Sequence, residues 1–321
     1  MFYQMEAQLM ADLKTLGEVA SVFFRLGAFA YGGPAAHIAM MQEEVVQKRQ
    51  WMSEQEFLDL VGVTNLIPGP NSTEMAIHCG YIRAGTLGLL LAGICFIFPA
   101  VFITGLIAWF YAQYGSLPNI EPFFFGIKAA VIVIIGNAVI TLGRKAVSSR
   151  KLAVLGLLAV ILSLLGLPAV AVILGLGVVG MINFSRTGSG NMPVLQAALP
   201  ILGAGSAAVT PVIPAITVTT SHLFLVFLKI GFVLFGSGYV LIAFLNDELV
   251  HKLGWLTSQV LMDSVAIGQF TPGPVLSTAT FIGYQIAGLE GAAAATVGIF
   301  SAIIFLRSVA EPDFAVSAPF A

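Results

Sequence analysis

Long apolar runs dominate this chain, and most of them have the length of a membrane-spanning helix. About 20 mostly apolar residues are needed to cross the hydrocarbon layer of a bilayer. The segments that satisfy this requirement are residues 86–111, 123–142, 222–245 and 289–306. A longer run, 152–183, is split by Gly166 and Pro168 into two short spans. The pattern therefore predicts an all-α, polytopic helical membrane protein.

Two weaker apolar elements occur early in the chain. Residues 18–33 are apolar but contain Arg25, and residues 57–81 are broken in the middle by a Pro-Gly-Pro triplet. Proline removes a backbone donor and glycine permits unusual dihedral angles, so a helix is expected to break there. The second element would then dip into the membrane and return.

Basic residues indicate the side of the membrane on which each loop lies. Arg144, Lys145, Arg150 and Lys151 cluster in one short loop, which the positive-inside rule places in the cytoplasm. The loop 113–122 has no basic residue and is expected outside. With this assignment Arg83 and Arg186 also lie on the cytoplasmic side of the membrane.

Composition supports a lipid environment and excludes several other classes. Of 321 residues, 58% are hydrophobic and only 9% are charged, against roughly a quarter charged in soluble domains. A net charge of −2 leaves no basic stripe for nucleic acid. The first sixteen residues carry charges and no continuous apolar core, so no cleavable signal peptide is expected. We expect a multi-pass protein of the cell's inner (plasma) membrane, with the lipid bilayer as its surroundings.

The strongest pattern in the chain is an internal repeat. A shift of 204 residues aligns residues 22–70 with 226–274 without a gap, and 16 of the 49 positions are identical. Shared positions that are rarely alike by chance include a Trp, a Glu, a Lys, an Asp and the whole Pro-Gly-Pro triplet. After one deletion, Gly80 and Tyr81 match Gly283 and Tyr284. The sequence therefore predicts a tandem duplication.

The repeat gives a division of the chain into parts. We expect a first repeat at 1–186, a linker at 187–220, a second repeat at 221–306 and an atypical tail at 307–321. If residues 57–81 dip in and return and the linker does not span, five crossings separate the two copies. An odd number would invert the second copy relative to the first, as in many secondary transporters.

Helix breaks at equivalent places in two halves are a strong sequence indication of a transport site. Asn71 to Glu74 read as a helix start, with Asn71 as the cap and Glu74 reaching back to it. A helix N-terminus within the membrane offers free N–H groups to an anion. Simple kinks between packed helices are the alternative. The candidate substrate-binding residues at the breaks are Pro68, Gly69, Pro70, Asn71, Ser72, Pro272, Gly273 and Pro274.

Arg25 and Lys229 occupy the same repeat position within apolar segments. A cation there costs about 2.5–3.5 kcal/mol on insertion scales, so it usually faces a polar cavity or a partner. Two such cations would suit a dianionic substrate, and snorkelling to the headgroups is the alternative. Gly32, Gly33 and Gly236 follow them and permit either close helix packing or a second unwound segment.

Glu74 has no acidic counterpart, because Thr278 stands at the aligned position. A buried carboxylate beside an anion site can accept a proton, so Glu74 is a candidate coupling residue, and a capping acid that never titrates is the alternative. The acidic and basic residues before each Trp, such as Glu44 and Glu248, read as a solvated or interfacial amphipathic helix. We expect no cofactor and no catalytic residue. We also expect no metal site, since the side chains around His37 mix soft and hard ligands.

At these motifs the sequence resembles the chromate ion transporter family. The resemblance is carried by Phe24-Arg25-Leu26-Gly27 through Gly32-Gly33-Pro34, by the stretch Glu43 to Trp51, and by Asn65-Leu66-Ile67-Pro68-Gly69-Pro70-Asn71. It implies a long-chain, two-domain transporter that exports chromate from the cytoplasm, with sulfate as the natural competitor. The driving force does not follow from the resemblance, and proton coupling is a hypothesis.

Three alternatives stay open at this stage. By the repeat offset the second half ends near the counterpart of Pro118, so it lacks three helices, and a truncated, inactive family member is one alternative. A homodimer or a partner subunit could supply the missing packing. An importer of sulfate or another oxyanion would use the same site chemistry. An intramembrane enzyme is disfavoured, because Glu74 with His78 is the one candidate catalytic pair.

Overall fold

The computed structural model describes residues 2–65, 69–115, 149–165, 175–180, 218–234 and 239–310, with isolated positions between 126 and 172. These residues are helical, with no strand among them, so the predicted all-α class is confirmed for this part of the chain. The helices are α1 (Phe2–Phe29), α2 (Gly33–Gln42), η1 (Glu43–Lys48), α3 (Glu54–Thr64), α4 (Asn71–Tyr114), α6 (Arg150–Leu164), α8 (Thr220–Val233), α9 (Tyr239–Leu245), η4 (Asn246–Lys252), α10 (Ser258–Phe270), η5 (Val275–Ser277) and α11 (Thr278–Ala310).

The chain forms two compact units. Residues 1–138 and 218–321 make one unit, and residues 139–217 make the other. Below, the first half means the described residues 2–115, and the second half means 218–310. In the second unit, α6 begins after Ser149, whose hydroxyl accepts a hydrogen bond from the Leu152 N–H at 3.3 Å, and it ends at Leu164. Gly166 and Pro168, the predicted split, lie outside the described residues, as do most of 123–142 and of 187–220.

The first half begins with a helix longer than the sequence predicted. α1 runs from Phe2 to Phe29, whereas the apolar pattern starts at residue 18. The helix then unwinds at Gly32 and Gly33, whose φ angles are 108° and 75°, before α2 starts. Only glycine adopts such angles at little cost, so the glycine pair gives an unwound segment.

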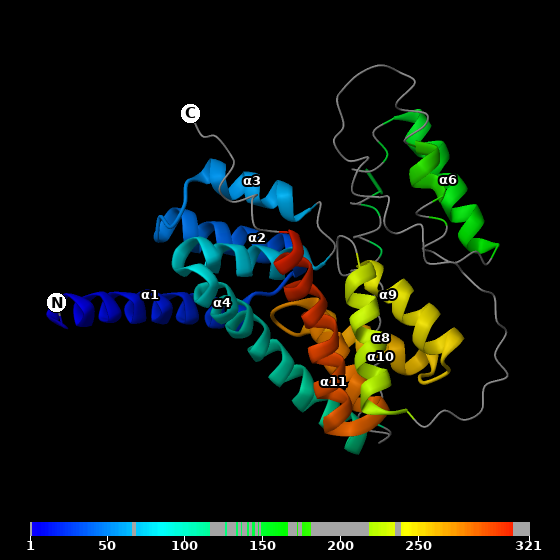
Figure 1. Cartoon of the computed structure of the whole chain (residues 1–321). Coiled ribbons are helices and arrows are strands. Elements are labelled where there is room, and N and C mark those ends of the chain that lie inside the picture. Colours follow the sequence, from blue (N-terminus) through cyan, green and yellow to red (C-terminus); the bar gives the residue numbers. More distant parts are fainter. Residues whose placement is uncertain are drawn as a thin grey trace. The chain divides into compact units, whose positions relative to one another are not determined.

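α4 is not a straight helix but a helical hairpin (Figure 1). Ala84 and Gly85 depart from helical angles, with φ of −144° and 60°. A straight helix would separate residues 77 and 93 by about 24 Å, yet a Cβ on Gly93 would lie 2.9 Å from Ile77 Cγ2. The first arm of the hairpin, Asn71 to Gly80, is buried along its whole length. The turn at Ala84 and Gly85 lies just beyond residues 57–81, and the dip of that segment into the membrane stays a prediction.

α11 in the second half has the same shape. Ala287 and Gly288 carry φ angles of −144° and 61°, close to those at the α4 turn. The hydroxyls of Thr280 and Thr296, sixteen residues apart, lie 2.7 Å from each other across the two arms. Among the described residues, α4 and the stretch Val275–Ile303 are long and apolar enough to cross a membrane.

One predicted span is wrong. The sequence indicated a continuous helix over 222–245, but α8 ends at Val233 and α9 begins at Tyr239. The fourteen residues of α8 extend about 21 Å, which is short of the roughly 30 Å hydrocarbon layer. Gly236, at the equivalent of Gly32, lies in this interval and outside the described residues.

Each half contains a short π-helix that the sequence did not predict. η1 and η4 occupy repeat-equivalent positions before Trp51 and Trp255. A π-helix places side chains five residues apart above one another, and it occurs most often at functional sites. Its five-residue spacing shows in the ion pair of Lys252 with Asp247, at 2.7 Å.

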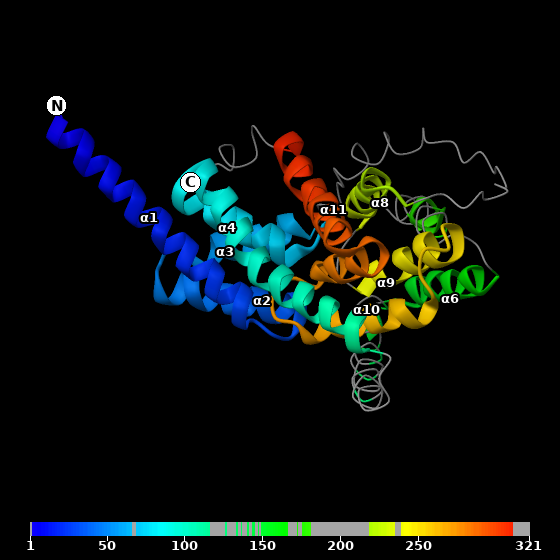
Figure 2. The same cartoon turned by 90° about the horizontal axis from the view of Figure 1, so that it is seen from below.

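Within each half, two helices pack closely at a glycine, and the halves share part of an apolar core. A Cβ on Gly231 of α8 would lie 2.7 Å from the Ile299 carbonyl of α11, and Gly27 of α1 meets the Phe96 carbonyl of α4 in the same way. α8 and α11 lie side by side in both views (Figures 1 and 2). Ile77 of the first half belongs to the apolar cluster of the second. The first arm of α4 is therefore buried between the halves.

Candidate functional site

The two interrupted segments meet the opposite half through a matched pair of backbone hydrogen bonds. The Gly69 N–H donates to the Leu234 carbonyl at 2.7 Å, and the Gly273 N–H donates to the Ala30 carbonyl at 3.0 Å. Both donors and both acceptors are 204 residues apart in the sequence. Such an exchange of identical contacts is what an approximate two-fold relation between the halves produces.

Glycine is required at these contacts. Gly69 and Gly273 have φ angles of 139° and 80°. A Cβ on Gly273 would lie 2.8 Å from the Gly27 carbonyl oxygen and 2.8 Å from Ala100 Cβ. The triplet of the second half thus reaches the end of α1 in the first half. Pro70, Pro272 and Pro274 are buried beside these glycines, and Pro68 lies outside the described residues.

The helix start after the first break is confirmed, but its predicted cap is wrong. α4 begins at Asn71, its N-cap is Pro70, and no side chain caps it. The Asn71 amide instead faces α3, where it accepts a hydrogen bond from the Thr64 hydroxyl at 2.5 Å and donates to Asn65 at 2.7 Å. Packing against α3 therefore takes the side chain away from its own helix end.

Glu74 is buried close to the first break. Its side chain is 1% exposed, and a Cβ on Gly69 would lie 3.0 Å from its Oε1. The His78 Nδ1 lies 2.9 Å from the Glu74 carbonyl and 3.9 Å from its Oε2. Ser72 and Thr73 beside it are buried as well. A coupling role for Glu74 remains a prediction.

Further polar contacts join the second arm of α4 to the second half. The Thr104 hydroxyl donates to the Ser277 hydroxyl at 3.2 Å. The Tyr111 hydroxyl donates to the Asp263 carboxylate at 2.7 Å, and Gln285 donates to the Ala108 carbonyl at 3.0 Å. Buried hydroxyls between apolar helices are expensive unless they are hydrogen-bonded. Their gathering at this place marks it as a polar core within an apolar molecule.

Arg25 and Lys229 each pair with a carboxylate of their own half. Arg25 contacts Glu44, and the Lys229 Nζ lies 2.7 Å from Glu248 Oε1. The spacing between cation and carboxylate is the same in both halves. The two cations are 56% and 59% exposed, whereas the side chains of Glu44 and Glu248 are only 6% and 15% exposed. Of the two readings of this stretch, a solvated helix does not fit the buried Glu44, and an interfacial helix stays a prediction.

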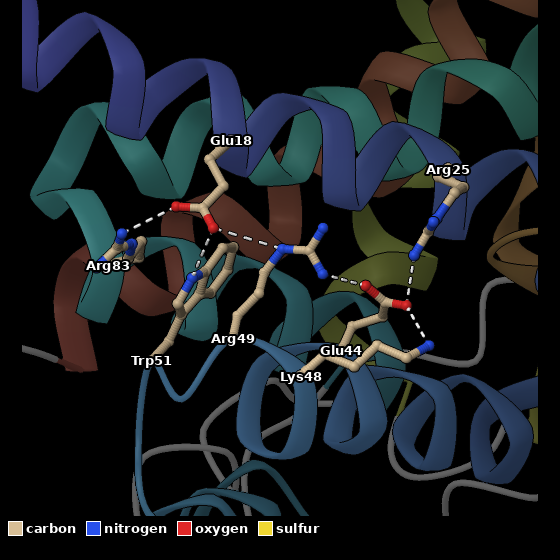
Figure 3. Close-up of polar contacts among 7 residues, drawn as sticks. All are labelled: Glu18, Arg25, Glu44, Lys48, Arg49, Trp51 and Arg83. Carbon is tan, nitrogen blue, oxygen red and sulfur yellow. Dashed lines mark hydrogen bonds and ion pairs between the residues drawn. The ribbon is translucent and has the colours of Figure 1, made fainter.

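In the first half, Glu44 belongs to a larger ionic network (Figure 3). It also binds Arg49 and, at 3.0 Å, Lys48. Burial by itself raises the pKa of Glu44, but the hydrogen bond from Lys48 and the charges of Arg25 and Arg49 outweigh it and lower the pKa below its usual value. Glu44 is therefore ionised at neutral pH.

Glu18 of α1 forms the other end of the network. It accepts from Arg83 at 2.9 Å, from Trp51 at 3.4 Å and from Arg49 at 3.4 Å. Arg83, just before the α4 turn, also lies 5.6 Å from the Trp51 ring centre. These contacts tie α1, the segment after η1 and the α4 turn to one another.

The second half keeps only part of this network. His222, Leu253 and Ile286 stand where the first half has Glu18, Arg49 and Arg83. The pair of Lys229 with Glu248 is retained, and Lys252 joins it at 3.3 Å. Sequence reasoning missed both carboxylate partners, although the equal spacing of cation and acid in the two copies would have revealed them.

A space of about 270 Å³ adjoins the pair in the first half. It is lined by Arg25, Leu26, Phe29, Met40, Glu43, Glu44 and Lys48. This volume holds several water molecules, each of about 30 Å³ in the liquid. An anion of moderate size can therefore reach the exposed side of Arg25.

Helices broken within an apolar core, two matched halves and a buried polar centre define the class of helical membrane transporters. The sequence profile described as Chromate transporter matches residues 17–181 and 221–314. The chain belongs to this family. It is a family of transporters, so the chain is not an enzyme. The match continues beyond residue 306, where the sequence repeat was expected to end.

Curated relatives cover most of the chain. A probable chromate transport protein of Synechococcus elongatus is 31% identical over 94% of this chain and 77% of its own length. A chromate transport protein of Cupriavidus metallidurans is 31% identical over 95% of this chain and 76% of its own length. An uncharacterised transporter of Methanocaldococcus jannaschii is 29% identical over 89% of this chain and 74% of its own length. No solved structure matches the chain.

Proposed function

We propose that this protein is a secondary transporter that exports chromate from the cytoplasm across the inner membrane. The observation that carries the proposal is the reciprocal contact of Gly69 with Leu234 and of Gly273 with Ala30. It sets each buried helix break against the end of a helix in the opposite half, α8 for Gly69 and α1 for Gly273. Secondary transporters hold their substrates at such breaks between related halves. The names of the relatives supply the substrate, chromate.

The residue roles follow from charge and position. Arg25 and Lys229 supply positive charge to a tetrahedral dianion, and the backbone N–H groups at the start of α4 attract its oxygens. The Ser72 hydroxyl at that helix start offers a further donor, whereas the Asn71 amide is held by Thr64 and Asn65. Glu74 is the coupling group, because a carboxylate this deeply buried can exchange a proton as the substrate charge comes and goes.

We further propose that the two halves are repeats of opposite orientation in a multi-pass protein. The matched hairpin turns at Gly85 and Gly288 support the repeat. An approximate two-fold axis lying in the membrane plane would invert one half relative to the other. The buried first arms of α4 and α11 would then enter from opposite sides, as alternating access requires.

Accumulation of labelled chromate in cells that express this chain tests the function. We expect wild type to lower accumulation, and Arg25→Ala and Lys229→Ala each to abolish that effect. Both variants should still insert, because Glu44 keeps Lys48 and Arg49 as partners, and Glu248 keeps Lys252. Arg150→Ala, at an exposed position of α6, serves as the control.

Unchanged chromate accumulation with well-inserted wild type would contradict the export proposal. A rise in accumulation would indicate import instead, and competition by sulfate would then identify the shared oxyanion chemistry. Full activity of both alanine variants would contradict the role of the paired cations.

A further inference from the structure

Glu44 and Glu248 each form an ion pair with one of the two candidate substrate cations, Arg25 and Lys229. Each carboxylate is largely buried, and each cation is more than half exposed. An ionised carboxylate is chemically close to one edge of a tetrahedral oxyanion, since both present two oxygens to a cation. Each cation therefore contacts its carboxylate on one side, and the rest of its surface is exposed.

Both halves keep the pair together with the lysine that follows it, Lys48 or Lys252. Around them, Glu18, Arg49 and Arg83 of the first half are replaced by His222, Leu253 and Ile286 in the second. The retained part of the network is therefore the part that contains the candidate substrate cation. The cation itself changes from Arg to Lys, so the contact depends on charge and not on fork geometry.

The charges around the pair leave room for a further anion. In the first half, four cations (Arg25, Lys48, Arg49 and Arg83) face three carboxylates (Glu18, Glu43 and Glu44), a surplus of one positive charge. The space of about 270 Å³ is bounded by four of these groups, Arg25, Lys48, Glu43 and Glu44. An anion that enters it meets Arg25 and Lys48 and competes with the two carboxylates for them.

We propose that Glu44 and Glu248 are resident counter-ions of the transport site, which a divalent oxyanion displaces from Arg25 and Lys229 when it binds. This inference rests on the proposed function. In the empty transporter the carboxylates neutralise cations that would otherwise be costly in an apolar helix. When the substrate leaves, they return to the cations and prevent it from rebinding, so they set both affinity and release.

The test is equilibrium binding of chromate, sulfate and monovalent nitrate to the purified full chain in lipid nanodiscs at fixed low salt. We expect Glu44→Gln and Glu248→Gln to bind chromate about tenfold more tightly, because a competing charge-assisted contact is removed. Asp59→Asn is the control, because Asp59 is exposed, accepts a hydrogen bond from Gln55 and lies outside both the ionic network and the space beside Arg25. Its chromate affinity should equal that of wild type.

Transport by the same variants provides a second measurement. The glutamine variants should show a lower KM and a lower kcat, since tight binding slows release, whereas Glu44→Asp should restore both. Thermal unfolding shows whether each variant is folded. Should Glu44→Gln fail to fold, Glu248→Gln decides, because its side chain is less buried and has only two cationic partners.

The outcomes separate the two proposals. Equal or weaker chromate affinity in a folded glutamine variant would overturn the counter-ion role alone. Tighter binding by these variants, with no effect of wild type on cellular chromate, would support the counter-ions and overturn export. Absence of binding of either divalent oxyanion to wild type would overturn both.

Discussion

Arg25 illustrates how an apolar helix carries a charge in this protein. The sequence offered two interpretations, a cation facing a polar cavity and a side chain snorkelling to the headgroups. The structure adds a protein partner, Glu44, while leaving the outer side of the guanidinium exposed. At this scale, a pair of residues and not the single cation is the unit that the two halves share.

Position 27 has room only for glycine, because the backbone oxygen of Phe96 lies where a side chain would begin. We expect Gly27→Ala to destabilise the protein by about 1–3 kcal/mol, because the new methyl group would meet the Phe96 carbonyl of α4. Gly231→Ala should act in the same way against Ile299. Thermal unfolding of the purified protein measures both.

Gly17→Ala is the control for this prediction. Gly17 lies in the same helix, and a methyl group added there would have no atom of another residue within 4 Å. Alanine at this position should therefore be neutral or stabilising by up to about 1 kcal/mol. Equal stability of Gly27→Ala and Gly17→Ala would show that α1 and α4 are not in close contact.

At the scale of elements, the short helices begin with caps that can be compared. Ser53 caps α3, and the Ser53 N–H in turn donates a hydrogen bond to the Glu56 carboxylate at 2.6 Å. α10 begins with Thr257 at the equivalent position, but Val260 replaces the acid. The first cap thus contains a titratable group and the second does not.

This difference predicts a pH dependence. The hydrogen bond from the Ser53 N–H lowers the pKa of Glu56 below its ordinary value of 4.5. A lowered folded-state pKa gives stability that is present above the ordinary value and is lost as the pH falls through the folded one. The stability difference between wild type and Glu56→Gln should therefore be full near neutral pH and shrink below pH 4.5.

Unfolding measured from about pH 7 to about pH 3 checks this expectation. The effect of Thr257→Ala, a loss of about 1 kcal/mol, should stay constant over the same range. A stability difference for Glu56→Gln that does not change with pH would mean that the hydrogen bond between the Ser53 N–H and Glu56 does not form in the folded protein.

At the scale of the whole molecule, hydrogen bonds between the halves hold the polar centre together. Tyr111 of α4 donates to Asp263 of α10 at 2.7 Å. We expect Tyr111→Phe to cost about 1.5–3 kcal/mol, the range for a hydrogen bond to a charged group. Thermal unfolding should show the loss, and chromate transport should fall with it because the hydrogen bond joins the two halves.

Tyr114→Phe is the matched control, since Tyr114 ends the same helix and is 41% exposed. Its stability should stay within about 0.5 kcal/mol of wild type. Similar effects of the two substitutions would argue against a contact between α4 and α10.

Local chemistry was enough to predict the helical class of this protein and the position of its helix breaks. Apolar length indicated helices in lipid, and proline with glycine marked where α3 and α4 separate, because both residues act on their own backbone. The family followed from motifs in sequence order. The same reasoning failed over 222–245, since an apolar run has equal hydropathy whether or not the helix is continuous.

Only the tertiary structure decided which groups meet. Nothing in the chain order states that Gly69 bonds to Leu234, that Glu44 neutralises Arg25, or that Asn71 turns to Thr64 and leaves its helix end uncapped. These contacts form because helices that are distant in the sequence pack together. They are determined by that packing and not by the local conformational preference of each residue. The sequence alone therefore identified a transporter with two matched helix breaks, and the fold joined each break to the opposite half and gave each cation its carboxylate.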